Sequence, residues 1–251
     1  MSRIFDAMKK SDANPRVVPP GHGVPAPFSH PGELLRGSMP LLGALPLGEA
    51  TLREMSALRV TLESTMRDRS PRVVMFLGSQ GGEGTSTIAL QFAQVLARDV
   101  AVRPLVVDCH AQRPAYLVDE SRRCAVVSPE LLAGSEDQGP IVTANLFVVP
   151  VSEGHRVAGI IQPAALRETI DANSPGFGWV VLDGPPVLDS PDAAALGAVA
   201  DGVVLVIQVG RTKRPVLARA ADLLSKAGSR MLGSVLNRRI HEIPEFLYRR
   251  I

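Results

Sequence analysis

Short apolar runs alternate with stretches of helical spacing between residues 73 and 236. The runs are rich in Val, Ile and Leu and are continuously apolar, which is typical of strands in a sheet covered on both faces. The stretches between them place apolar residues three and four positions apart, a spacing that predicts helices. This alternation predicts an α/β fold with a doubly wound, mainly parallel sheet. The predicted strands are 73–77, 105–107, 146–149, 179–182, 203–209 and 231–236, and the predicted helices are 86–97, 162–172, 191–199 and 215–227.

The N-terminal part of the chain has a different pattern. Ile4, Phe5 and Met8 fall on one face of a short helix, which we predict over 1–12 as an interaction segment. Residues 13–46 are dense in Pro and Gly, which interrupt regular structure. We therefore predict a disordered N-terminal arm, in which a flexible linker follows the short helix.

Helical spacing returns at Glu49 and ends before Ser70. The predicted α/β domain spans 47–240, and a tail of 241–251 follows it. The tail region places apolar residues at helical spacing beside four arginines, which suits a membrane-surface or partner helix. A last helix that packs on the domain is an equally good interpretation. The apolar residues concerned are Ile240, Ile243, Leu247 and Ile251.

Composition narrows the function classes. The chain has 251 residues, a formal net charge of +2 and 21% charged residues, which describes an ordinary soluble surface and does not favour a nucleic-acid partner. No apolar run approaches the ~18 residues that span a membrane, so we expect peripheral membrane association only. The two cysteines, Cys109 and Cys124, lack metal-ligand spacing, which favours a reducing, cytoplasmic location and no zinc site.

A glycine-rich loop, GSQGGEGTST, joins the first strand of the array to a helix. Gly81, Gly82 and Gly84 permit a tight turn whose N–H groups converge, and the helix adds its positive N-terminal end. Ser86 stands where the hydroxyl of a P-loop reaches Mg²⁺, but the position before it holds Thr85 in place of lysine. A plain strand-to-helix turn is the alternative. The strand–loop–helix setting favours a descendant of the P-loop.

Two acidic residues follow predicted strands, as a P-loop protein requires. Asp108 ends the run PLVVD, and Asp183 ends the run WVVLD. Carboxylates at these strand ends would hold Mg²⁺ directly or through its water molecules. Either one alone would also fit an Asp that caps the following turn.

These motifs resemble those of the bacterial tyrosine kinases that partner polysaccharide co-polymerases in capsule and exopolysaccharide assembly. That family shares its deviant P-loop (Walker) topology with the partition and division-site ATPases. The family's PGEGKST appears as GGEGTST at 81–87, its DADLRRP as DCHAQRP at 108–114, and its DTPP as DGPP at 183–186. The ending GSVLNR resembles the family's last strand, and the likeness covers about 45–240.

The resemblance implies an ATP or ADP site with Mg²⁺. Asn237 would contact adenine, and Ser86, Asp108 and Asp183 would hold the metal ion. Asp108 and Asp183 would also be what remains of the catalytic machinery. The nucleotide-binding residues that the resemblance implies are Gly81, Gly82, Glu83, Gly84, Thr85, Ser86, Thr87 and Asn237.

Departures from the family pattern fall on charged positions. Thr85 replaces the lysine that reaches the β- and γ-phosphates, and Gln80 fills the place of the second lysine of the partition ATPases. His110 replaces the second-motif Asp, and imidazole is a poor ligand for Mg²⁺. Loss of one such preorganised charge contact typically costs ~10²–10³ in rate. We therefore expect little or no phosphoryl transfer.

Two further departures concern regulation. The family's oligomer-forming helix carries Glu-x-x-Arg-x-x-Arg, where this chain has Arg53, Ser56 and Arg59. The tyrosine-rich tail is reduced to Tyr248. The resemblance thus implies a degenerate kinase-like protein at the cytoplasmic side of the inner membrane, attached through a membrane co-polymerase or a partner kinase. It also makes a homo-oligomer a possible assembly.

Two alternatives stay open. The first is an active tyrosine autokinase with a rearranged ATP site, in which Arg211 or Lys213 supplies the missing charge. The second is a partition- or division-site-type ATPase, which the absence of both loop lysines disfavours.

Overall fold

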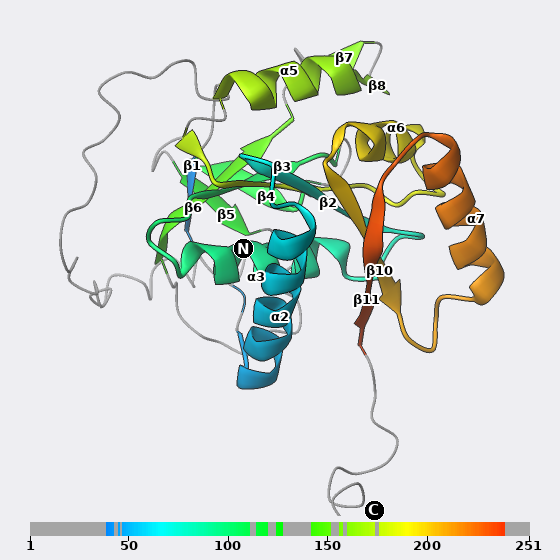
Figure 1. Cartoon of the computed structure of the whole chain (residues 1–251), viewed down its shortest axis with the longest axis horizontal. Helices are drawn as coiled ribbons and strands as arrows, with labels where there is room; N and C mark the ends of the chain where they lie inside the picture. Colours follow the sequence, from blue (N-terminus) through cyan, green and yellow to red (C-terminus); the bar gives the residue numbers. More distant parts are fainter. Residues whose placement is uncertain are drawn as a thin grey trace, which may run out of the picture. The chain divides into compact units, whose positions relative to one another are not determined.

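A nine-stranded sheet dominates the part of the chain that the computed structural model describes, namely residues 39–42, 45, 47–110, 114–119, 124–127, 142–151, 156–157, 160–173 and 176–238 (Figure 1). The strand order is β11-β10-β2-β9-β3-β6-β1-β5-β4. The six strands from β11 to β6 are parallel to one another, whereas β1 runs antiparallel to β6 and β4 antiparallel to β5. The predicted mainly parallel, doubly wound sheet is therefore confirmed.

The elements follow the chain in alternation. The strands of the sheet are β1 (Met39–Leu42), β2 (Arg72–Gly78), β3 (Pro104–Asp108), β4 (Tyr116–Asp119), β5 (Cys124–Val127), β6 (Val142–Pro150), β9 (Trp179–Asp183), β10 (Gly202–Gln208) and β11 (Met231–Asn237). The helices are α2 (Glu49–Thr65), α3 (Thr85–Ala97), α5 (Pro163–Asn173), α6 (Pro191–Val199) and α7 (Arg214–Lys226), and β7 (Arg156–Val157) pairs with β8 (Ile160–Ile161) in a separate hairpin. Each of the six predicted strands and five predicted helical segments has its counterpart here.

The linker predicted over 13–46 needs one correction. Residues 39–42 form β1, which pairs with β5 on one side and β6 on the other, and Leu41 is fully buried. The strand is only four residues long and lies among prolines and glycines, so its stability comes from these long-range neighbours rather than from local propensity. The predicted helix at 1–12, the rest of the arm before residue 39, and the tail at 241–251 lie outside the described residues.

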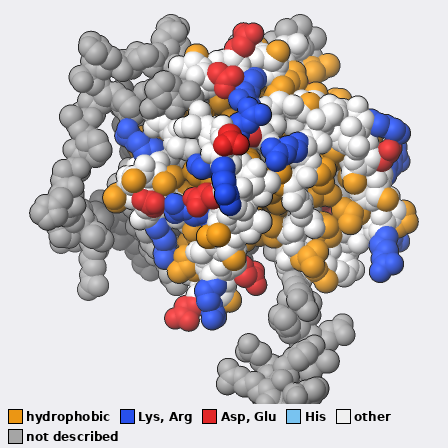
Figure 2. Space-filling view, in the orientation of Figure 1, with side chains coloured by type: hydrophobic (Ala, Val, Ile, Leu, Met, Phe, Trp, Pro, Cys, Tyr) orange, Lys and Arg blue, Asp and Glu red, His pale blue; other side chains and the backbone are white. Residues whose placement is uncertain are grey.

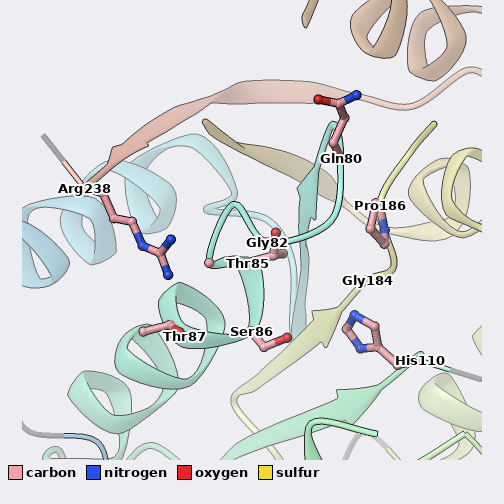
Figure 3. Close-up of a pocket in the computed structure, with 10 residues that line it drawn as sticks. Gln80, Gly82, Thr85, Ser86, Thr87, His110, Gly184, Pro186 and Arg238 are labelled. Carbon is pink, nitrogen blue, oxygen red and sulfur yellow. The ribbon is translucent and has the colours of Figure 1, made fainter. Parts of the chain in front are cut away.

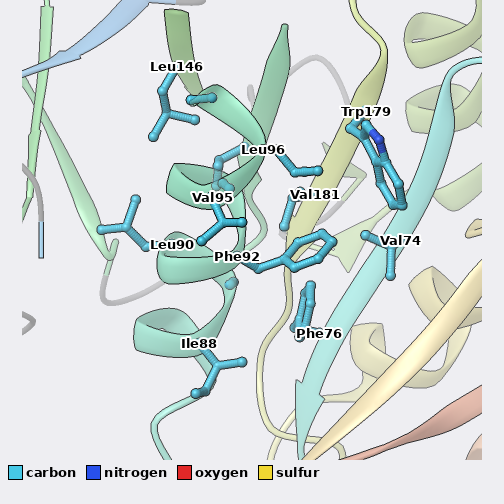
Figure 4. Packing of buried hydrophobic residues seen from close by; sticks show 14 of the residues in the cluster. Val74, Phe76, Ile88, Leu90, Phe92, Val95, Leu96, Leu146, Trp179 and Val181 are labelled. Carbon is cyan, nitrogen blue, oxygen red and sulfur yellow. The ribbon is translucent and has the colours of Figure 1, made fainter. Parts of the chain in front are cut away.

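The sheet has a helix layer on each face. Along β2, Val74 and Phe76 point to the face covered by α2 and α3, while Val73, Met75 and Leu77 point to the other face, where buried residues of α5, α6 and α7 lie. This is the two-sided burial that continuously apolar strands predict. On the first face Phe92 of α3 lies 5.4 Å from the ring of Phe76 and 5.6 Å from that of Trp179 (Figure 4).

The surface of the described residues carries mixed charge. In the view of Figure 2, Lys and Arg side chains are interspersed with Asp and Glu, with apolar groups between them. None of the described helices combines the length and the apolar character that crossing a bilayer requires.

The parallel order brings the C-terminal ends of β2, β3, β9 and β10 to the same edge of the sheet. In register, Phe76 of β2 lies beside Asp183 of β9, and Asp183 lies beside Asp108 of β3. Sheets of this kind bind ligands at this edge. Every candidate site residue predicted from the sequence lies here.

Candidate functional site

The glycine-rich loop runs from the end of β2 to the start of α3. Gly84 precedes the helix with a φ of 87°, a left-handed conformation that glycine adopts without steric cost. The N–H groups of Thr85, Ser86 and Thr87 point out of the first turn of α3 and meet no acceptor among the described residues. They face a cavity of about 220 Å³, which makes a ready site for an anion (Figure 3).

Glu83 braces this loop from the inside. Its carboxylate is 2% exposed and accepts hydrogen bonds from the backbone N–H of Ser79 (2.5 Å) and of Gln80 (3.1 Å). It also accepts from the hydroxyl groups of Ser79 (2.7 Å) and Thr212. The predicted nucleotide-binding residue Glu83 is therefore turned away from the cavity and holds the loop's shape.

A second carboxylate contacts the loop from outside. Asp189, in the turn after β9, accepts a hydrogen bond of 3.1 Å from the N–H of Gly81. The N–H groups of Ser79, Gln80 and Gly81 are thus bonded within the protein. The N–H groups of Gly82, Glu83 and Gly84 meet no acceptor among the described residues, so they remain available to an anion together with those at the start of α3.

Thr85 lines the cavity with a short, uncharged side chain. Its hydroxyl lies close to the end of β2, since a Cβ built on Gly78 would come within 2.7 Å of Thr85 Oγ1. No lysine lines this cavity among the described residues.

Asp183 and Ser86 meet at the floor of the site. Ser86 Oγ donates to Asp183 Oδ1 over 3.1 Å, while Asp183 Oδ2 is buried without a hydrogen-bond partner among the described residues. The pKa of the Asp183 carboxyl is raised from 3.8 to about 7, and burial is the largest cause. The charge of Asp108 contributes to this rise, whereas His110 and the hydrogen bond from Ser86 oppose it. A buried, unpartnered carboxylate oxygen next to a hydroxyl suits a hard divalent cation.

Asp108 is already occupied by hydrogen bonds. Its Oδ1 accepts from the N–H of His110 (3.0 Å) and lies 2.9 Å from His110 Nδ1. Its Oδ2 accepts from the N–H groups of Ala115 (2.7 Å) and Tyr116 (3.4 Å). These contacts match the turn-capping interpretation of this residue.

His110 is held by Asp108 and directed into the cavity (Figure 3). Its Nδ1 lies 3.9 Å from Asp183 Oδ2. Burial lowers the pKa of His110, but the hydrogen bond to Asp108 and the charges of Asp183 and Asp108 raise it more, so its net shift is upward. One ligand atom from each of these three residues lies within 4.8 Å of the others.

The residues present fit Mg²⁺ in part. Ser86 Oγ and the unpartnered oxygen of Asp183 have the hard-oxygen chemistry that Mg²⁺ prefers. Asp108 could serve only through water molecules unless its backbone hydrogen bonds break. His110, which stands at the family's Asp position, adds a nitrogen donor to the same wall.

Asn237, at the end of β11, anchors the loop. Its Nδ2 donates to the carbonyl oxygen of Glu83 over 2.8 Å, and its Oδ1 accepts from the N–H of Arg238 over 2.8 Å. It also lines a larger cavity of about 630 Å³ between α2, α3 and β11. Thr87 and Arg238 line both cavities, so the two adjoin at these residues.

The two cations suggested as substitutes for the lysine do not line the loop cavity. Arg211 donates to the carbonyl oxygen of Gly82 over 3.4 Å and to Gln208 Oε1 over 3.3 Å, and Lys213 is an exposed residue just before α7. Arg238 does line it, a residue that our sequence reasoning missed although it ends the GSVLNR motif. On α2, Arg59 pairs within the chain, with Glu63 (2.8 Å) and Asp99 (3.0 Å).

Comparison with known proteins places these features in context. No protein-family model matches the chain. The chain is 28% identical over 187 residues to the tyrosine-protein kinase YwqD of Bacillus subtilis, an alignment that covers 72% of this chain and 78% of YwqD. It is 26% identical over 190 residues to the tyrosine-protein kinase CpsD of Streptococcus agalactiae, covering 73% and 81%. It also matches the succinoglycan biosynthesis transport protein ExoP of Rhizobium meliloti at 23% identity, covering 72% of this chain and 24% of ExoP.

Solved structures give the same answer for the fold. The kinase domain of the Escherichia coli tyrosine kinase ETK matches with a TM-score of 0.57 at 21% identity, covering 77% of this chain and 78% of that one. The kinase domain of VpsO matches with a TM-score of 0.54 at 23% identity, covering 76% and 96%. The resemblance inferred from the motifs is thereby confirmed: the homologues of this chain include bacterial tyrosine-protein kinases and a succinoglycan biosynthesis transport protein, and the chain has the fold of bacterial tyrosine-kinase domains.

Proposed function

We propose that this protein is a degenerate tyrosine-kinase-like regulator of exopolysaccharide or capsule synthesis, which binds a nucleotide weakly and transfers little or no phosphate. The observation that carries the proposal is Thr85, a short neutral side chain at the lysine position with its hydroxyl close to Gly78. Phosphoryl transfer depends on neutralising the charge that the β- and γ-phosphates carry, and Thr85 supplies none.

Binding still has support from the rest of the site. The N–H groups at the start of α3 remain available to phosphate oxygens, and Ser86 with Asp183 would hold Mg²⁺ beside them. That ion, held by Ser86 and Asp183, would neutralise part of the charge on the phosphate groups. The cavity between α2, α3 and β11 adjoins the loop cavity and is large enough for an adenine ring. A site that keeps its backbone donors and loses its lysine is expected to bind without efficient turnover.

The proposed pathway rests on the homologues. YwqD and CpsD are tyrosine-protein kinases, and ExoP is a succinoglycan transport protein whose matching part is about a quarter of its length. We propose that this chain acts beside the membrane through a co-polymerase or a partner kinase, with the arm at 1–12, outside the described residues, as its contact segment.

Phosphorylation assays test the proposal. Purified full-length protein with ATP and Mg²⁺ is expected to show negligible phosphate on Tyr248, with YwqD as the positive control. The double variant Thr85→Lys with His110→Asp returns both positions to the family's residues and is expected to gain kinase activity. Thr85→Lys alone is expected mainly to tighten ADP binding. Phosphorylation of the unaltered protein at the rate of the control would overturn the degenerate assignment.

An active autokinase with a rearranged site is the second candidate. It is favoured by one observation: His110 and Arg238, both able to carry positive charge, line the loop cavity. A partition-type ATPase gains no comparable support, because Gln80 and Thr85 stand where that group has its lysines.

A further inference from the structure

Arg238 occupies a special place at the end of β11. It is the one non-glycine residue among the described residues with a positive φ, 54°. It lines both the loop cavity and the cavity between α2, α3 and β11. No ion pair engages its side chain within the described part of the chain.

Hydrogen bonds fix the backbone of Arg238 relative to the loop. Its N–H donates to Asn237 Oδ1 over 2.8 Å, and the amide of the same Asn237 donates to the carbonyl oxygen of Glu83 over 2.8 Å. From this anchored position the side chain extends toward the start of α3, and its guanidinium lies near Thr85 and Thr87 (Figure 3).

A buried carboxylate behind Ser86, a residue that lines the same cavity, points to a bound ligand independently. Asp183 Oδ2 is fully buried and has no hydrogen-bond partner among the described residues, and Asp183 Oδ1 accepts from Ser86, which lines the cavity. A buried carboxylate oxygen without a hydrogen-bond donor is costly, and His110 Nδ1, at 3.9 Å from Asp183 Oδ2, is too far away to supply one. A divalent cation that accompanies a phosphate ligand would meet this need, and the residues at the start of α3 line the same cavity as Arg238.

We propose that Arg238, an exposed residue at the end of the last strand, supplies the permanent positive charge that binds the phosphate groups of a nucleotide at the glycine-rich loop. This inference rests on the proposed nucleotide binding and names a residue that would carry it. Arg211 is engaged with the outer side of the loop through the carbonyl oxygen of Gly82, and Lys213 does not line the cavity. Arg238 is thus the one permanently charged cation that lines it among the described residues.

The chemistry of the guanidinium suits this role. It stays charged at all physiological pH values and presents planar pairs of N–H donors that match two oxygens of one phosphate. A P-loop lysine belongs to the loop that binds the phosphates. Arg238 instead follows β11 and lies 154 residues after Gly84 in the sequence. The position of this charge relative to the loop therefore depends on the hydrogen bond between Asn237 and Glu83, which joins β11 to the loop.

Calorimetry on the full-length protein tests the proposal with three probes: ADP with Mg²⁺, inorganic pyrophosphate and adenosine. Arg238→Ala is expected to weaken binding of ADP and of pyrophosphate by about tenfold or more, the range for loss of a charge-assisted hydrogen bond. Arg238→Lys should keep part of the affinity. Arg98→Ala makes the same charge change at the far, exposed end of α3 and should leave all three affinities unchanged. Adding Thr85→Lys to Arg238→Ala should restore phosphate binding.

The outcomes separate the inference from the proposed function. ADP and pyrophosphate affinities that are equal in Arg238→Ala and the unaltered protein would overturn the role of Arg238 and leave nucleotide binding intact. Loss of adenosine binding alone would also overturn it, because the side chain would then serve the base. If pyrophosphate binds in a way that depends on Arg238 and ADP does not bind, the role of Arg238 in phosphate binding would be supported and the proposed nucleotide binding overturned. No binding of any probe would overturn both.

Discussion

The side-chain amide of Asn237 donates a hydrogen bond of 2.8 Å to the carbonyl oxygen of Glu83, which joins the last strand of the sheet to the glycine-rich loop. The approach is so close that a Cβ on Gly84 would lie 2.2 Å from Asn237 Nδ2. Asn237, which the family resemblance implies would contact adenine, therefore also holds the loop in place. We therefore expect a nucleotide contact at Asn237 to be coupled to the shape of the loop.

Asn237→Ala is expected to lower the free energy of unfolding by about 1 kcal/mol, because one hydrogen bond between β11 and the loop is lost. Asn237→Asp should cost more, since its carboxylate would face the carbonyl oxygen of Glu83 without a donor. Urea denaturation measures both. Ser234→Ala, an exposed change on the same strand, is the control. Equal stabilities of Asn237→Ala and the control would mean that this hydrogen bond does not contribute.

Glu83→Gln is expected to destabilise the protein by about 1–3 kcal/mol. The buried carboxylate accepts from the N–H and hydroxyl of Ser79, from the N–H of Gln80 and from Thr212, and an amide can replace only part of this acceptor set. Thermal unfolding measures the loss, with Glu49→Gln in the exposed first turn of α2 as the control. A melting temperature that stays at the unaltered value would show that the loop keeps its shape without this brace.

Stability should fall with rising pH because of Asp183. Its folded-state pKa is raised to about 7, above the 3.8 of the unfolded chain, so the folded state binds this proton more tightly. The protonated carboxyl favours folding below about pH 4, and that advantage is lost as pH rises toward 7. The raised pKa of His110 acts in the same direction, because its charged form is favoured in the folded state and is lost as pH rises.

Asp183→Asn, measured with a chelator present, should therefore flatten the decrease in unfolding free energy between pH 5 and 8 and raise stability at pH 8. Asp222→Asn, an exposed change on α7, should leave the slope unchanged. Mg²⁺ should stabilise the unaltered protein at pH 8 and have little effect on Asp183→Asn. Parallel pH curves for the unaltered protein and Asp183→Asn would contradict the assignment.

Gly184→Ala is expected to cost about 1–3 kcal/mol through overpacking. A Cβ at this position would lie 2.3 Å from Met75 Cε and 2.4 Å from Leu77 Cδ2, with the carbonyl oxygen of Phe76 at 3.0 Å. Gly48→Ala is the control, because nothing lies within 4 Å of an added Cβ there. Chemical denaturation compares the two. If Gly184→Ala proves as stable as Gly48→Ala, Met75 and Leu77 repack at little cost.

Local sequence patterns predicted the six parallel strands of the sheet, the helices between them and the position of the glycine-rich loop. Val73, Met75 and Leu77 alternate with Val74 and Phe76, so one short run already specifies a strand that is buried on both sides. The acidic residues Asp108 and Asp183 could likewise be placed at one edge, because parallel strands end there together. These features are encoded locally, in a few consecutive residues.

The availability of polar atoms at that edge depends instead on contacts between segments that lie far apart in the sequence. The oxygens of Asp108 are taken by N–H groups of the following turn, whereas Asp183 Oδ2 has no partner among the described residues. Arg238 reaches the loop because β11 lies beside β10, and β10 beside β2. Apolar patterning carries no information on strand order or on side-chain partners 97 to 154 residues apart, such as Ser86 with Asp183 and Glu83 with Asn237. Those contacts form only when the strands pair. Residues 39–42 likewise become β1 because they pair with β5 and β6.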